Sequence, residues 1–249
     1  MSTAKDNRST TETSTTPTLH ISEVIRRFPE VSLISDTDLR VSVIRTLSHA
    51  PEYFWEVPAS ASKKYHNPFC RGQHGLWIHT KMAVTSFERV SNSWEELGLL
   101  SEYQRDCGLA ALLLHDMFKQ GYPTDRDSLP ESDQTTVKNH DELMAEWCRD
   151  HTSLPTPVIG AIESHNGPWY GGTEPSLQRL LDIVRSVRQT ESDPTAVQRD
   201  LTEFMVELIV HTCDMAASDP NGTLGVWKPA EEIREKYPNL PRAHFPHAE

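Results

Sequence analysis

The feature that most constrains the fold is a nearly continuous apolar stretch near the middle of the chain. Residues 102–118 read EYQRDCGLAALLLHDMF, and Ser101 before them is a residue type that commonly caps helices. A helix that is apolar around most of its circumference must be buried on most sides. The sequence therefore predicts a central buried helix, with His115 and Asp116 at its carboxyl end.

Several other segments have apolar residues at helical spacing, and no sustained strand pattern is visible. The spacing predicts helices over residues 36–49, 76–90, 138–149, 156–165, 176–187 and 197–217. Pro51 is expected to end the first of them, and Gly167 with Pro168 the fourth. Because there is also no internal repeat, the predicted fold class is all-α, an irregular helical bundle.

Composition limits the classes of partner. Asp and Glu outnumber Lys and Arg by 36 to 24, and the formal net charge of -12 argues against a general basic surface for duplex nucleic acid. No apolar run approaches the roughly 18 residues of a membrane span, and the Ser- and Thr-rich start is unlike a secretory leader. Four widely spaced cysteines without a CxxC motif are expected to be buried free thiols. We therefore predict a cytoplasmic protein with no membrane partner.

The pair His115 and Asp116 lies where the apolar helix emerges, and both side chains are costly to bury there. A divalent cation is the partner that best compensates an aspartate and an imidazole together. The alternative is a core histidine bonded to a backbone carbonyl, beside an aspartate at a helix end. The dipeptide alone leaves both interpretations open.

Further candidate ligands fall on different predicted helices, so converging helices would bring them together. Imidazoles with a bridging carboxylate suit Mn, Fe, Co, Ni or Zn better than Ca, and Mg remains possible. The complete set along the chain is His79, His115, Asp116, His140, His165 and Asp214.

The residues around these ligands resemble the successive motifs of the HD-domain superfamily of metal-dependent phosphohydrolases. The matching stretches are GLWIHT at 75–80, LLLHDMFK at 112–119, ESHNG at 163–167 and VHTCDMAAS at 210–218. PASASKKYH, which begins at Pro58, followed by HGLWIHT is most similar to the HD-domain 3'-5' exoribonuclease branch. The resemblance covers about residues 58–218.

The resemblance implies an HD-type helical bundle that holds two divalent ions. Asp116 would bridge the ions, and Lys119 matches the lysine three residues after that aspartate, so these two are the expected catalytic residues. Lys119 either stabilises charge on the transferred group or pairs with Asp116. The core metal ligands carried over are His79, His115, Asp116 and Asp214, and the ligands that complete a second metal site are His140 and His165.

Two departures from the exoribonuclease branch change the expectation. That branch carries a nucleic-acid-binding barrel before its HD domain, and nothing before Pro58 has the strand pattern for one, so processive RNA degradation is not predicted. The branch also has consecutive histidines where this chain reads His66-Asn67 and His165-Asn166. Asn does not replace imidazole as a strong ligand for these metals, so the second metal site is expected to be weaker or substrate-specific.

The stretch before the helix at 76 supplies the predicted substrate contacts. Basic residues there form a local funnel for phosphate or are merely a solvated loop, and its histidines contact substrate or lie on the surface. The residues assigned to substrate binding are His66, Arg71, His74 and Lys81, with Lys63 and Lys64 beside them. Farther along, Trp169 and Tyr170 stack on a base or cover the core.

The resulting prediction is a metal-dependent phosphohydrolase, a phosphatase or phosphodiesterase. A metal-activated hydroxide would attack a phosphomonoester or phosphodiester of a nucleotide or a short single-stranded nucleic acid. Two alternatives stay open: a non-catalytic regulatory protein that binds metal and nucleotide, and a di-iron HD-like oxygenase. Nothing in the sequence indicates the exact substrate or the oligomeric state.

The predicted domain organisation has four parts. At 249 residues, one main domain is the default. Residues 1–18 are predicted to be a disordered tail, 19–57 a helical extension that packs on the core, 58–219 the HD-type metal-binding domain, and 220–249 a C-terminal arm or tail rich in Pro, Gly and charge.

Overall fold

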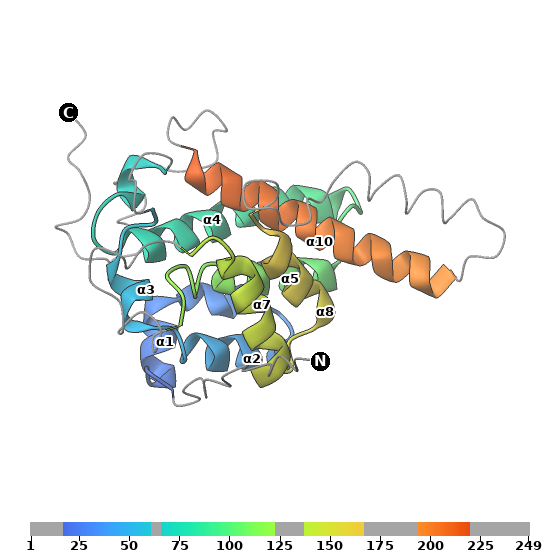
Figure 1. The fold of residues 1–249 in the computed structure, drawn as a ribbon. Coiled ribbons are helices and arrows are strands. Elements are labelled where there is room, and N and C mark those ends of the chain that lie inside the picture. The colour runs from blue at the N-terminus through green and yellow to red at the C-terminus, as the bar shows by residue number, and fades with distance from the viewer. Residues whose placement is uncertain (1–16, 61–65, 123–136, 167–193, 220–249) are drawn as a thin grey trace, which may run out of the picture.

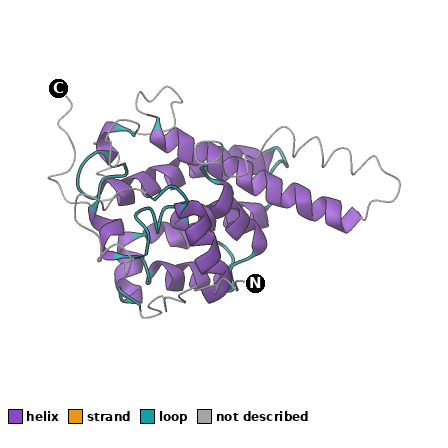
Figure 2. Ribbon diagram, in the orientation of Figure 1, coloured by secondary structure: helices purple, strands orange, loops and turns teal. Residues whose placement is uncertain are grey.

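The computed structural model describes residues 17–60, 66–122, 137–166 and 194–219 (Figure 1). These residues form helices joined by turns and loops, and no strand occurs among them (Figure 2). The predicted fold class, an all-α irregular bundle, is confirmed. The predicted helix over 176–187, residues 1–16 of the predicted N-terminal tail and the C-terminal arm lie outside the described residues, whereas Thr18 at the end of that tail donates to the carbonyls of Ser48 and Ala50.

The central helix is α5 (Glu102–Leu114), and it begins where the sequence predicts. Ser101 and Gln104 form a capping box, in which each side chain bonds to the other residue's backbone N–H. Every residue from Asp106 to Leu114 is buried. α5 packs against α2 (Thr37–Leu47), α4 (Gly75–Glu96), α8 (Thr156–Ser164) and α10 (Pro194–Ser218). The predicted burial on most sides is thereby confirmed.

The close packing of α4 on α5 depends on Gly108. A Cβ atom at this position would lie 2.6 Å from Cε2 of Phe87 on α4, closer than real Cβ contacts allow. The missing side chain therefore lets the two helices approach. Because His79 is on α4 and His115 follows α5, this approach also sets the spacing of two candidate ligands.

Helix α4 is longer than predicted, since it continues past Val90 to Glu96. The polar residues after Val90 led us to end the predicted helix there. Val90 and Trp94 pack against the core, however, and extend the apolar face of α4. The helix stops at Leu97, before Gly98 takes a positive φ of 68°. Figure 1 shows α4 lying alongside α10, and the two helices are in contact.

The first third of the chain forms short helices beside α2. They are α1 (Ile21–Arg27), the 3-10 helix η1 (Pro29–Leu33) and α3 (Glu52–Glu56), and a further 3-10 turn, η2 (Pro68–Cys70), precedes α4. Phe28, Phe54 and Trp55 from this region are buried in one hydrophobic core that extends to Ala217. The core is thus continuous across residue 57, and the domain boundary there stays a prediction.

Two of the compositional expectations have structural counterparts. Cys70, Cys107, Cys148 and Cys213 are free and buried, as expected. Burial raises the pKa of the Cys107, Cys148 and Cys213 thiols to about 12. No described helix has the length and apolarity needed to cross a membrane.

Candidate metal centre

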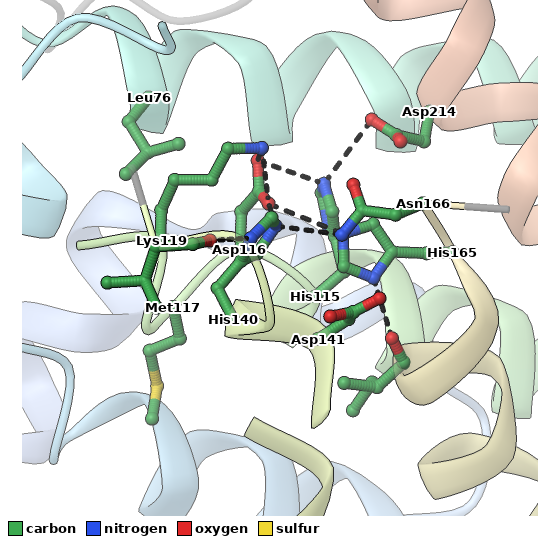
Figure 3. Close-up of polar contacts among 12 residues, drawn as sticks. Leu76, His115, Asp116, Met117, Lys119, His140, Asp141, His165, Asn166 and Asp214 are labelled. Carbon is green, nitrogen blue, oxygen red and sulfur yellow. Dashed lines mark hydrogen bonds and ion pairs between the residues drawn. The ribbon is translucent and has the colours of Figure 1, made fainter. Parts of the chain in front are cut away.

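Five helices bring the six predicted ligands to one place. His79 lies near the start of α4, and His115 and Asp116 follow the last residue of α5. His140 is the first residue of α7 (His140–His151), His165 is the C-cap of α8, and Asp214 lies in the last turns of α10. Figure 3 shows five of these side chains converging. Their ligand atoms form three overlapping sets, each within 4.8 Å: His79, His115 and Asp116; Asp116, His140 and His165; and His115, His165 and Asp214.

Asp116 divides the four histidines into two pairs. Its Oδ2 lies 3.6 Å from Nε2 of His79 and 3.5 Å from Nε2 of His115. Its Oδ1 lies 3.1 Å from Nε2 of His140 and 3.4 Å from Nε2 of His165. One carboxylate thus presents a different oxygen to each pair, which is the arrangement needed to bridge two cations.

Asp214 belongs to one of these pairs. Its Oδ1 lies 2.8 Å from Nε2 of His79 and 3.5 Å from Nε2 of His115. We call Asp214, His79, His115 and Oδ2 of Asp116 the first half-site. The second half-site consists of His140, His165 and Oδ1 of Asp116.

Three of the histidines are oriented in the same way by the backbone. The Nδ1 atoms donate to the carbonyl three residues earlier: His115 to Leu112 at 2.8 Å, His140 to Val137 at 2.8 Å, and His165 to Ile162 at 2.6 Å. A carbonyl only accepts, so Nδ1 carries the hydrogen and the Nε2 lone pair points to the centre. Metal-ligating histidines are commonly held by such a bond from the other ring nitrogen.

The centre is buried and favours positive charge. The four imidazoles have no exposed surface, and Asp116 is 1% and Asp214 5% exposed. Burial opposes charge on His115, but Asp116 and Asp214 outweigh burial and raise the pKa of this imidazole. Burial likewise opposes ionisation of Asp214, yet the neighbouring imidazoles of His115 and His79 hold its pKa well below the usual range.

The donor set fits a cation at each half-site. Nε2 of His165 is buried without a hydrogen-bond partner among the described residues, although it lies 3.4 Å from an oxygen of Asp116. Because both of these atoms present lone pairs, a positive ion between them would satisfy both. The alternative of a histidine bonded only to a backbone carbonyl accounts for Nδ1 of His165 and leaves its Nε2 unexplained.

Lys119 pairs with Asp116. Its Nζ donates to both carboxylate oxygens, at 2.9 and 3.0 Å. Burial alone would raise the pKa of Asp116, but Lys119 and then His115 hold it well below the usual range. In Figure 3, Lys119 reaches the carboxylate from one side and His165 with Asn166 from the other.

Of the predicted substrate contacts, His66 lies beside the centre. Its ring centroid is 5.1 Å from that of His79, and its buried Nδ1 has no hydrogen-bond partner in the part of the chain that the structure describes. Burial, followed by the nearby His79 and Lys119, lowers the pKa of His66 to about 3. Arg71 acts on the same segment, because its Nε donates to the carbonyl of His66 at 2.8 Å.

The structure shows intramolecular partners for His74 and Lys81, and their assignment to substrate binding stays a prediction. Nδ1 of His74 lies 2.5 Å from the carbonyl of Trp55, and its backbone has a positive φ of 62° before α4. Lys81 is 2% exposed, and its Nζ donates to both oxygens of Glu30 at 3.0 and 3.1 Å. Lys81 is thus held in a buried ion pair with Glu30.

The sequence indicated Asn166 only as a departure that makes the second metal site weaker or substrate-specific, and it assigned no role to His211. Nδ2 of Asn166 lies 3.1 Å from Nε2 of His140, and Nδ1 of His211 donates to the carbonyl of His165 at 2.7 Å. The signals were adjacency alone: Asn166 follows a ligand, and His211 precedes Asp214 by one helical turn. Lys63, Lys64, Trp169 and Tyr170 lie outside the described residues.

Comparison of the chain with protein-family models, with curated proteins and with solved structures gives no significant match.

Proposed function

We propose that this chain is a metal-dependent phosphohydrolase of the HD-domain type. The observation that carries the proposal is the division of the four imidazoles between the two oxygens of Asp116. A bridging carboxylate with two histidines on each side is a donor set for two divalent ions a few ångströms apart. The sequence motifs around the same ligands support the family assignment.

Two bound divalent ions would polarise the phosphoryl oxygens and lower the pKa of a water far enough to supply the nucleophile. The residues of the chain hold and orient the two half-sites. Asp116 fixes the separation of the two half-sites, and the Nδ1 bonds of His115, His140 and His165 keep their lone pairs turned inward. Hydrolysis forms one P–O bond from water and breaks another, and the leaving oxygen takes up a proton.

Lys119 and His66 are the residues placed to act on the substrate. Lys119 is 9% exposed and lies at the carboxylate that both half-sites share, so its ammonium can offset charge on the transferred group. His66 stands over His79 with a nitrogen that lacks a partner, and we propose that it contacts a phosphoryl oxygen. Arg71 positions His66 through its carbonyl.

The substrate we propose is a small phosphorylated molecule, either a nucleotide or a short single-stranded nucleic acid. The net charge of -12 provides no general attraction for a long polyanion, so recognition must come from the centre itself. The four free, buried cysteines fit a reducing compartment, and we place the reaction in the cytoplasm.

The test is reconstitution of chelator-treated protein with Mn, Fe, Co, Ni, Zn or Mg, followed by assays on phosphomonoesters, cyclic nucleotides, nucleotides and oligonucleotides. Hydrolysis of one class is expected to require metal, and Asp116→Asn should abolish it because the amide cannot bridge two cations. His151→Ala, at the exposed end of the helix that begins with His140, is the matched control and should keep full activity. Stoichiometric nucleotide binding without product release would instead identify a regulatory protein.

Iron chemistry is a second candidate, because four imidazoles and two carboxylates also suit di-iron sites. Iron in the purified protein together with oxygen-dependent turnover, and no phosphate release under any cation, would select the oxygenase.

A further inference from the structure

We propose that the two half-sites hold cations with unequal affinity and that Asn166 sets the difference. The inference rests on the proposed two-metal function and gives Asn166 a positioning role that controls when the second half-site fills. Two independent properties of the centre lead to it: the negative charge around each half-site, and the hydrogen bond that Asn166 makes to a ligating nitrogen.

The half-sites differ in charge. The first has two carboxylates, since Asp214 lies 2.8 Å from His79 and Asp116 supplies Oδ2. The second half-site has Oδ1 of the shared Asp116, and a carboxylate oxygen of Asp214 lies across the centre from it, within 4.8 Å of a ring nitrogen of His165. A divalent cation gains more Coulomb energy beside two carboxylates than beside one that it shares, so the first half-site fills first.

Asn166 adds a direct obstacle at the second half-site. Nδ1 of His140 donates to Val137, so the free lone pair of this ring is on Nε2. The amide Nδ2 of Asn166 lies 3.1 Å from that Nε2 and donates to it. A cation that uses this lone pair must displace a buried hydrogen bond. Nε2 of His79 also has close polar neighbours, Asp214 at 2.8 Å and Nε2 of His115 at 3.3 Å, but both of these are ligands of the same half-site, so a cation there takes the place of a proton and no ligand is lost.

The position of Asn166 makes it able to act on both properties. It directly follows His165 and is 7% exposed. Its amide lies beside the imidazole of His140 (Figure 3). Aspartate has nearly the same shape, but it would supply a second carboxylate and would remove the competing N–H. One substitution therefore removes the charge difference and the competition together.

The test titrates chelator-treated protein with Mn²⁺ and measures free Mn²⁺ by electron paramagnetic resonance, which requires no activity. Wild type is expected to bind in two steps whose dissociation constants differ by about 10-fold or more. Asn166→Asp should tighten the second step by about 10-fold and leave the first unchanged. Asn139→Asp is the matched control, because it adds the same charge beside His140 at an exposed residue before α7.

Two equal steps in wild type, or an Asn166→Asp curve that superimposes on it, overturn the inference while a two-metal centre stands. If Asn139→Asp tightens the second step as much as Asn166→Asp does, the effect comes from net charge alone, and the inference is also overturned. Asn166→Ala keeps the test decisive if the aspartate variant does not fold: its second step should be at least as tight as that of wild type, and a weaker one overturns the competition. Absence of Mn²⁺ binding by wild type overturns the proposed function itself.

Discussion

Lys119 lies one turn after Asp116 and donates from a single ammonium to both oxygens of its carboxylate, at 2.9 and 3.0 Å. These are the same two oxygens that face the two pairs of histidines. The lysine and any bridging cations therefore compete for one buried carboxylate. Breaking a buried ion pair is costly because it leaves one charge uncompensated, unless another cation takes the empty place.

This competition predicts that Lys119→Met has a metal-dependent effect on stability. Chelator-treated variant should lose about 3 kcal/mol of unfolding free energy, because Asp116 is left without its lysine. The loss should shrink in excess Mn²⁺, since bound cations then compensate Asp116. Urea unfolding with and without Mn²⁺ measures both values. Lys138→Met, at an exposed position, should change stability by no more than about 0.5 kcal/mol, and equal losses of Lys119→Met in both conditions would contradict the competition.

The division of ligands predicts different metal contents for variants of the two half-sites. His115→Ala should lose the tightly held ion, because it removes a donor from the half-site with two carboxylates. His140→Ala and His165→Ala should each retain about one ion, because the first half-site keeps all its ligands. Elemental analysis after desalting measures the content, with His151→Ala as a control that retains the wild-type amount. One ion in wild type and no change in the last two ligand variants would make the centre mononuclear.

Close packing at Gly108 predicts a stability loss that does not depend on metal. A methyl group there would meet the Phe87 ring at 2.6 Å, and such overpacking costs about 1–3 kcal/mol. Gly160→Ala is the matched change within another helix, where Cβ would lie 3.4 Å from Oε1 of Glu207; it should be neutral or stabilising by up to about 1 kcal/mol. Thermal unfolding compares the two, and a Gly108→Ala variant as stable as wild type would show that α4 and α5 adjust freely.

The sequence was sufficient for the helices whose apolar pattern is strong. α5 could be placed from its capping serine and its apolar run, because helix capping and burial on most sides are both visible in the local sequence. The end of α4 could not, since Val90 and Trp94 extend it through contacts with residues distant in the chain. Short helices such as α1 and α3 were also missed individually, because five to seven residues carry too little periodicity.

The convergence of the six candidate ligands was predictable because imidazoles and carboxylates inside apolar helices need a reason to be there. The contacts of the residues around the centre were not predictable from the sequence. His74 and Lys81 are close in sequence to His79, yet His74 bonds to Trp55 and Lys81 turns to Glu30. Lys81 is two residues from His79 and therefore faces a different side of α4, whereas His74 precedes the helix with a positive φ of 62°. Asn166 acquires its role only through the approach of α7, which no local pattern contains.

The last prediction concerns His211, which ties the ligand-bearing helix α10 to the end of α8. Its Nδ1 donates to the carbonyl of His165 at 2.7 Å, and Asp214 follows on the same helix one turn later. α10 thus supplies a ligand to the first half-site and holds the backbone of a ligand in the second.

His211→Leu should weaken the second step of Mn²⁺ binding by about 10-fold, because His165 loses its support, while the first step changes little. His211→Gln should restore it, since an amide N–H can reach the same carbonyl. Thr212→Val, the neighbour whose hydroxyl bonds only to Leu208 within its own helix, is the control for a change on α10. Mn²⁺ titration together with thermal unfolding separates positioning from stability: if His211→Leu lowers the melting temperature but leaves both binding steps intact, His211 merely packs α10 and does not position His165.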